Sequence, residues 1–221
     1  MIHDEEKLSE QQSLHIIQQM IETAKQEQKD DGKGWIIWGW LLFFTSIFTW
    51  LNIQYHWFKN IALFWNAVGV CVMLYWIYRM LNYFSGRSNE KVKTYTADLF
   101  AKLNSGFFIF LLLIIFSMNI PVRGVPPSKG FMLLIGLYGF WILVYGAALN
   151  FRPSIIAAYI TWVIAFAGLF IYKIDQTEGG EFQLVMLVHA FAVLVGYIIP
   201  GHIAYKEFNK LNKKGNIIKS V

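Results

Sequence analysis

The sequence predicts an all-α membrane protein: a bundle of six transmembrane helices with both termini in the cytoplasm, preceded by an amphipathic helix. Three observations support this fold class, namely long apolar runs, a scarcity of charge and an uneven distribution of basic residues. Of the 221 residues, 56% are hydrophobic and 15% are charged, whereas a soluble domain carries about 25% charged residues. No acidic residue lies between Asp31 and Glu90, or between Asp98 and Asp175.

Six apolar segments approach or reach the length of about 20 residues that a helix needs to cross a bilayer. They cover residues 35–53, 61–83, 101–120, 131–149, 154–172 and 182–204. In lipid each must be helical, because only a helix satisfies its own backbone groups within one segment. Together they form a predicted transmembrane domain over residues 34–205.

The distribution of Lys and Arg predicts the orientation of this domain. With six spans, fifteen of these residues lie on the side that holds both termini, and four lie on the other side. Because short cytoplasmic loops carry the excess of Lys and Arg, both termini are predicted to be cytoplasmic, with the domain in a cell inner membrane. This topology accounts for the net charge of +5, so membrane lipids and not nucleic acid are the expected partner.

The first 33 residues hold eight acidic side chains and four lysines. Ser9 and Gln12 fit a capping box at a helix start. An apolar stripe follows at helical spacing, made of Leu14, Ile17, Met20, Ile21 and Ala24. We expect an amphipathic helix over residues 10–29. It either packs on the cytoplasmic face of the bundle or docks a cytoplasmic or membrane protein partner, or a second copy, through residues 8–29.

Two further cytoplasmic segments are predicted. An apolar stripe with Tyr95, Leu99 and Leu103 indicates a helix that leads directly into the third span. The tail, residues 206–221, holds five lysines and one acid. Such a basic tail is expected to contact lipid headgroups, and we hypothesise that it also pairs with the acidic N-terminal segment.

The stretch SLHIIQQMIETAK, followed by GKGWIIWGW, resembles an uncharacterised family of small multi-pass membrane proteins of Bacteroidota. The resemblance covers about the first 45 residues. It implies a bacterial inner-membrane protein and a gene neighbourhood with small winged-helix regulators. It supplies no catalytic residues.

Motifs for chemistry are sparse in this sequence. No Asp, Glu, Lys or Arg lies deep in a predicted span, which disfavours proton coupling and carboxylate-bound metals. There is no HExxH motif and no phosphate-binding glycine loop. The one cysteine, Cys71, is expected to be a small buried core residue. We therefore predict no catalytic residue, no metal site and no cofactor.

The functional candidates are polar residues in or beside the spans: His189, Asn66 and His202. His189 and Asn66 are both predicted in the outer half of the membrane, where a hydrogen bond between them is one hypothesis. His202 is predicted at the cytoplasmic interface. It lies about 20 Å along the helix from His189 and about 140° around it, so the two histidines cannot share a metal.

Two other features of the spans carry functional alternatives. A Ser–His intramembrane protease would need Ser46 or Ser117 beside a histidine, although neither has a GxSxG context. Gly196 and the pair Pro200–Gly201 are expected to bend the sixth span, either as a transporter hinge or as a local kink.

These observations favour a non-enzymatic membrane protein that regulates or scaffolds a partner at the cytoplasmic face. The alternative is a small transporter or channel subunit for a neutral or lipophilic solute. An intramembrane enzyme is the third reading.

Overall fold

The computed structural model of the protein describes residues 31–84, 95–119, 126–170 and 180–219. Its helices are α2 (Lys33–Tyr55), α3 (Leu63–Phe84), α4 (Tyr95–Asn119), α5 (Pro127–Ala148), α6 (Arg152–Gly168), α7 (Gly180–Val193), the π-helical turn η2 (Leu194–Ile198) and α8 (Ile199–Lys219). No strand occurs within these ranges, so the predicted all-α class is confirmed. The amphipathic helix predicted over residues 10–29 lies outside the described residues.

Each of the six predicted spans coincides with a helix. Four described stretches are long and apolar enough to cross a membrane: Lys33–Tyr55, Lys102–Asn119, Pro127–Ala148 and Glu181–Lys210. The shorter apolar helices Leu63–Leu74 and Arg152–Gly168 overlap the second and fifth predicted spans. Four of the six apolar runs therefore contain a helix of membrane-crossing length and composition, and the other two contain a shorter apolar helix.

The helix bounds agree with the prediction at the start of α4 and depart from it at the end of α6 and in the last helix. α4 begins at Tyr95 and continues unbroken into the third apolar run, as its apolar stripe predicted. α6 ends at Gly168, four residues before the end of the predicted fifth span. The last helix does not stop at residue 204 but continues to Lys219, so most of the predicted basic tail is helical.

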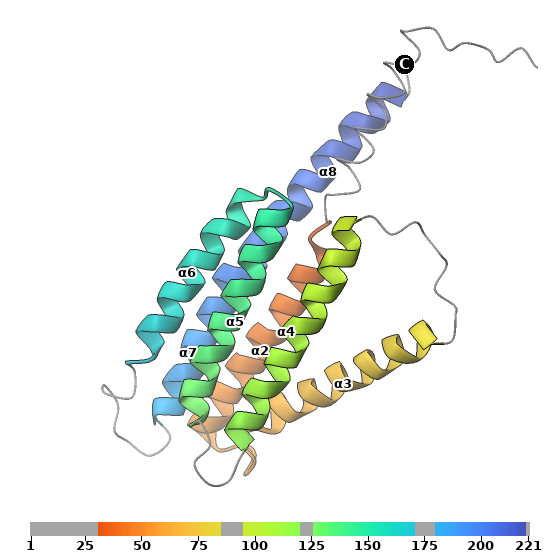
Figure 1. The fold of residues 1–221 in the computed structure, drawn as a ribbon. Helices are drawn as coiled ribbons and strands as arrows, with labels where there is room; N and C mark the ends of the chain where they lie inside the picture. The colour runs from red at the N-terminus through yellow and green to blue at the C-terminus, as the bar shows by residue number, and fades with distance from the viewer. Residues whose placement is uncertain (1–30, 85–94, 120–125, 171–179, 220–221) are drawn as a thin grey trace, which may run out of the picture.

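Helices α2, α5, α6 and α7 lie side by side, with α4 against α5 (Figure 1). α5 and α6 form a tight antiparallel hairpin. Asn150 adopts the left-handed conformation at the turn, with φ 51°, and the N–H of Phe151 donates to the carbonyl of Gly146 at 2.8 Å. Along the hairpin, Nε1 of Trp162 donates to the carbonyl of Gly136 at 3.0 Å. The hairpin is thus held by bonds at its turn and along its length.

The helix α2 buries one face against the last helix. The buried residues of that face recur every three or four positions: Trp35, Gly39, Leu42, Thr45, Ser46, Thr49 and Asn52. The contact is close because glycines line it. A Cβ on Gly32 would lie 2.6 Å from the carbonyl oxygen of Gly201. The start of α2 therefore touches the start of α8, at one end of the bundle.

The last helix changes from α to π geometry between Leu194 and Ile198. The N–H of Ile199 bonds the carbonyl of Leu194, five residues earlier. Pro200 follows directly and has no N–H to continue the α-helical pattern, so a π turn there is a physically reasonable outcome. This turn occupies the position at which Gly196 and Pro200 predicted a bend.

The helix α3 diverges from the bundle, while its first turn stays close to the end of α2 (Figure 1). Asn52, buried at the end of α2, fixes the connection. Its Oδ1 accepts the N–H of Phe58 at 2.7 Å, and its Nδ2 donates to the carbonyl of Asn60 at 3.3 Å. Cys71 lies on the diverging part of α3 and is exposed. The prediction that Cys71 is a buried core residue is wrong, because α3 does not enter the core at that point.

Candidate functional site

His189 on α7 is completely buried and bonds a serine of another helix. Its side chain is 0% exposed, and its Nδ1 lies 2.8 Å from Oγ of Ser46 on α2. Ser46 is equally buried. At this depth a polar atom has no water to bind, so leaving it unpaired would be costly. The Ser46–His189 bond therefore joins α2 to α7 inside the apolar core.

A second contact of Ser46 assigns the tautomer of His189. The Oγ of Ser46 also lies 2.8 Å from the carbonyl oxygen of Leu42. A carbonyl oxygen only accepts, so with both contacts counted as hydrogen bonds the single hydroxyl hydrogen of Ser46 is assigned to Leu42. The oxygen of Ser46 then accepts from Nδ1–H of His189. In the uncharged imidazole this leaves Nε2 with a lone pair and no hydrogen.

Three aromatic rings surround the imidazole. The ring centroids of Trp65, Phe131 and Tyr138 lie 5.1, 5.5 and 5.7 Å from the centroid of His189. Their planes are inclined to the imidazole by 85°, 87° and 66°, which is the edge-to-face arrangement that aromatic pairs favour. We call these three residues the aromatic box. It is built by α3 and α5 and closes around the side of His189 that Ser46 leaves free.

Two buried polar atoms of this site make no hydrogen bond within the described part of the chain. They are Nε2 of His189 and Nε1 of Trp65. Native proteins rarely leave buried donors or acceptors unpaired, and each exception calls for an explanation. Both atoms belong to rings that contact each other, so we look for one explanation of both unpaired nitrogens.

The predicted hydrogen bond between Asn66 and His189 is wrong. Asn66 is exposed on α3, and the bond to Nδ1 of His189 comes from Ser46. The preceding residue, Trp65, is the one that contacts His189. Successive residues on a helix point about 100° apart, and in α3 Trp65 faces His189 whereas Asn66 is exposed.

His202, the third candidate, lies on α8 and is exposed. The π turn separates it from His189, and the structure does not bring the two histidines together. Among the residues described, no three side chains of His, Cys, Asp or Glu gather where they could hold a metal ion. The site is therefore built around one histidine.

The Ser46–His189 pair has the residue types of a hydrolytic dyad but not its arrangement. A serine nucleophile must donate its hydrogen to the histidine that activates it. Ser46 instead donates to Leu42, and Nδ1 of His189 is itself a donor. Both side chains are also fully enclosed. This geometry fits an interhelical bond and does not favour the protease reading.

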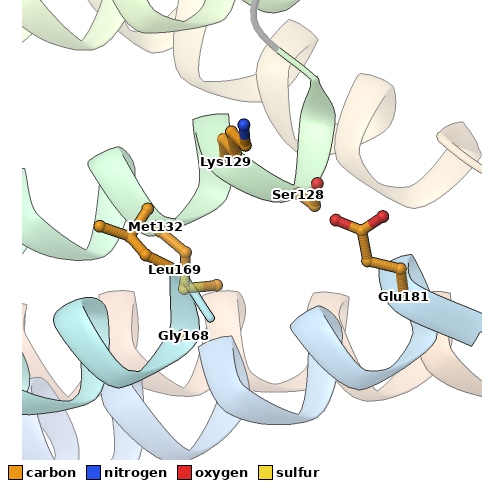
Figure 2. Close-up of a pocket in the computed structure, with 6 residues that line it drawn as sticks. All are labelled: Ser128, Lys129, Met132, Gly168, Leu169 and Glu181. Atoms are coloured by element: carbon orange, nitrogen blue, oxygen red, sulfur yellow. The ribbon is translucent and has the colours of Figure 1, made fainter. Parts of the chain in front are cut away.

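A transporter whose solute passes His189 would need a water-accessible cavity that reaches this residue. His189 is fully buried behind the aromatic box, so in this conformation no such route reaches it. A depression lies elsewhere in the described part of the chain, between α5, the end of α6 and the start of α7 (Figure 2). Ser128 and Glu181 lie on one side of it and Met132 and Leu169 on another, and it is too narrow to admit a water molecule.

Ser46 was considered in the sequence only as a protease serine, and the three residues of the aromatic box were not singled out. Ser46 had a usable signal, because it continues the stripe of Trp35, Gly39 and Leu42 at spacings of three and four. Its neighbours Thr45 and Thr49 share that face but bond only to carbonyls of their own helix. For Trp65 no such signal exists, since tryptophans near span ends are expected at the membrane interface.

No protein-family model, curated protein or solved structure matches this chain. The function must therefore be argued from the geometry alone.

Proposed function

We propose that the protein is a non-enzymatic integral membrane protein that regulates or scaffolds a partner at its cytoplasmic face. In this proposal it crosses a bacterial inner membrane six times and keeps both termini in the cytoplasm. The cytoplasmic role is supported by the length of the last helix. α8 continues the sixth apolar helix and extends beyond the other helices of the bundle (Figure 1). Such an extension can present a surface to a partner outside the lipid.

Three features support the proposed topology. The start of α2 and the start of α8 lie at the same end, with Gly32 against Gly201. Six helices joined by connections of modest length return the chain to the side on which it began. Fifteen of the nineteen Lys and Arg residues fall on that side, as expected of the cytoplasmic face.

The topology is testable with single cysteines in a Cys71→Ala background. In intact cells or spheroplasts, a membrane-impermeant maleimide is expected to label Lys59→Cys, which lies between α2 and α3. Lys206→Cys on α8 is expected to react only after the membrane is disrupted. Labelling in the reverse order would contradict the proposed orientation, and equal labelling of both sites would contradict a sealed six-span topology.

The exposed face of α8 is basic. Lys206 and Lys210 are both exposed, and at a spacing of four residues they lie on the same side of the helix. Lys213, Lys214 and Lys219 follow in the sequence. A partner that recognises this face would therefore present acidic side chains, and the attraction would weaken with salt.

Purification from native membranes in mild detergent tests the proposed role. A stoichiometric partner is expected at low salt and is expected to dissociate as the salt concentration rises. Exposed ion pairs contribute up to about 1 kcal/mol each, and a charge reversal also replaces attraction by repulsion. Lys206→Glu with Lys210→Glu should therefore weaken retention about tenfold, equivalent to about 1.4 kcal/mol. Lys59→Glu, a charge reversal at the opposite end, is the matched control and should retain the partner. Equal retention by all variants would remove α8 from the proposal.

A further inference from the structure

The two unpaired atoms at His189 have complementary chemistry. Nε1–H of Trp65 is a donor without an acceptor, whereas Nε2 of His189, in the tautomer assigned above, is an acceptor without a donor. They do not bond each other directly. A single group satisfies both if it accepts one hydrogen bond and donates another. A hydroxyl group does so, and a carbonyl or an ether oxygen does not.

The two atoms belong to neighbouring side chains of one aromatic cluster. The rings of Trp65 and His189 are 5.1 Å apart, and Phe131 contacts both, at 4.9 Å and 5.5 Å. Tyr138 adds another ring beside His189. Apart from the two nitrogens, the cluster is aromatic, so any remainder of a ligand beyond its hydroxyl must be apolar.

Movement of α3, the helix that packs least against the bundle, would open the cluster around His189. Trp65 lies in the first turns of α3, which diverges from the bundle beyond that point (Figure 1). Residues of α3 on its diverging part, such as Val70 and Met73, are exposed. A small outward movement of α3 would separate Trp65 from His189 without breaking the contact of α2 with α7. Access is therefore from the apolar surface between helices.

We propose that Nε1 of Trp65 and Nε2 of His189 together bind one hydroxyl group, between α3 and α7. Two sources supply this chemistry: a water molecule, or an apolar alcohol or phenol that arrives from the lipid phase. The inference is independent of the proposed cytoplasmic role, since it uses none of the residues of α8.

The test follows the indole N–H signals of protein labelled with ¹⁵N-tryptophan in detergent micelles. The chain has nine tryptophans, and the signal lost in Trp65→Phe, or in Trp65→Tyr should that variant not fold, identifies Trp65. The probes are 4-octylphenol and its methyl ether, which differ only in the ability of the oxygen to donate. The phenol is expected to shift the Trp65 signal saturably, and the ether is not. Trp162, whose Nε1 already donates to Gly136, is the internal control.

The same spectra separate the two sources. A saturable shift with the phenol alone identifies a site for an apolar hydroxyl compound. A magnetisation-transfer signal between water and the Trp65 indole proton, with no response to the phenol, identifies water as the bound hydroxyl. The proposal is overturned if the Trp65 proton shows neither effect, or if phenol and ether shift Trp65 and Trp162 alike.

Discussion

Removing either partner of the Ser46–His189 bond will destabilise the protein, and removing both will cost less than the sum. Ser46→Ala leaves Nδ1–H of His189 buried with no acceptor. Such an unsatisfied group costs about 1–3 kcal/mol in proteins generally, and interhelical bonds in membranes average about 0.6 kcal/mol and reach about 1.7 kcal/mol. In a His189→Phe background, the same serine substitution leaves no polar atom unpaired. A coupling free energy of about 1 kcal/mol is therefore expected.

The measurement is a double-mutant cycle on the free energy of unfolding in mixed detergent micelles. Thr45→Ala provides the control, because Thr45 neighbours Ser46 but bonds only to the carbonyl of Leu41 on its own helix. Thr45→Ala and His189→Phe should be additive to within about 0.5 kcal/mol. If Ser46→Ala and His189→Phe are also additive, the bond contributes nothing and the tautomer assigned from it loses its basis.

Two glycines of α2 should respond in opposite directions to the same substitution. A Cβ on Gly39 would lie 2.8 Å from Cγ1 of Ile198 and 3.0 Å from Cβ of Tyr197. Both neighbours are buried side chains that have little room to move. Gly39→Ala should therefore cost about 1–3 kcal/mol, the usual penalty for overpacking, and should push α2 away from the π turn.

Gly34→Ala is the matched control on the same helix. Gly34 is exposed, and no atom lies within 4 Å of the position a Cβ would take. Replacing glycine by alanine within a helix is favourable by about 0.5–1 kcal/mol, so Gly34→Ala should be neutral or stabilising. Thermal unfolding of both variants in one detergent gives the comparison. Similar losses at the two positions would mean that the close contact with Ile198 does not control the response.

The helices could be predicted from the sequence because length and apolar composition suffice to identify a span. The rotation of each span about its own axis could not. A membrane helix is apolar on the face that meets lipid and on the face that meets other helices, so hydropathy does not separate the two. This is why Asn66 was paired with His189 although it is exposed, and why Cys71 was expected in the core.

The polar residues of a span indicated which side of the helix faces the bundle better than the apolar residues did. Ser46 is at the correct spacing from Gly39 and Leu42 to share their face, so that stripe predicts which side of α2 enters the bundle. Its partner on α7 is fixed by tertiary packing, which no spacing within one helix reveals. The bend at Gly196 and Pro200 was predicted at the correct place, but its π geometry depends on how the chain redistributes its backbone bonds around the proline.

The π turn also determines how α8 is rotated about its own axis. A π turn holds one residue more than the α turn it replaces, and one residue corresponds to about 100° of rotation in an α-helix. If Leu194–Ile198 relaxed to α geometry, everything after it would turn by about that angle while α7 stayed in place. Lys206 and Lys210 would then face a different sector around the bundle. The one extra residue of the π turn thus determines the direction in which the basic face points. This residue lies on the same continuous helix that carries His189.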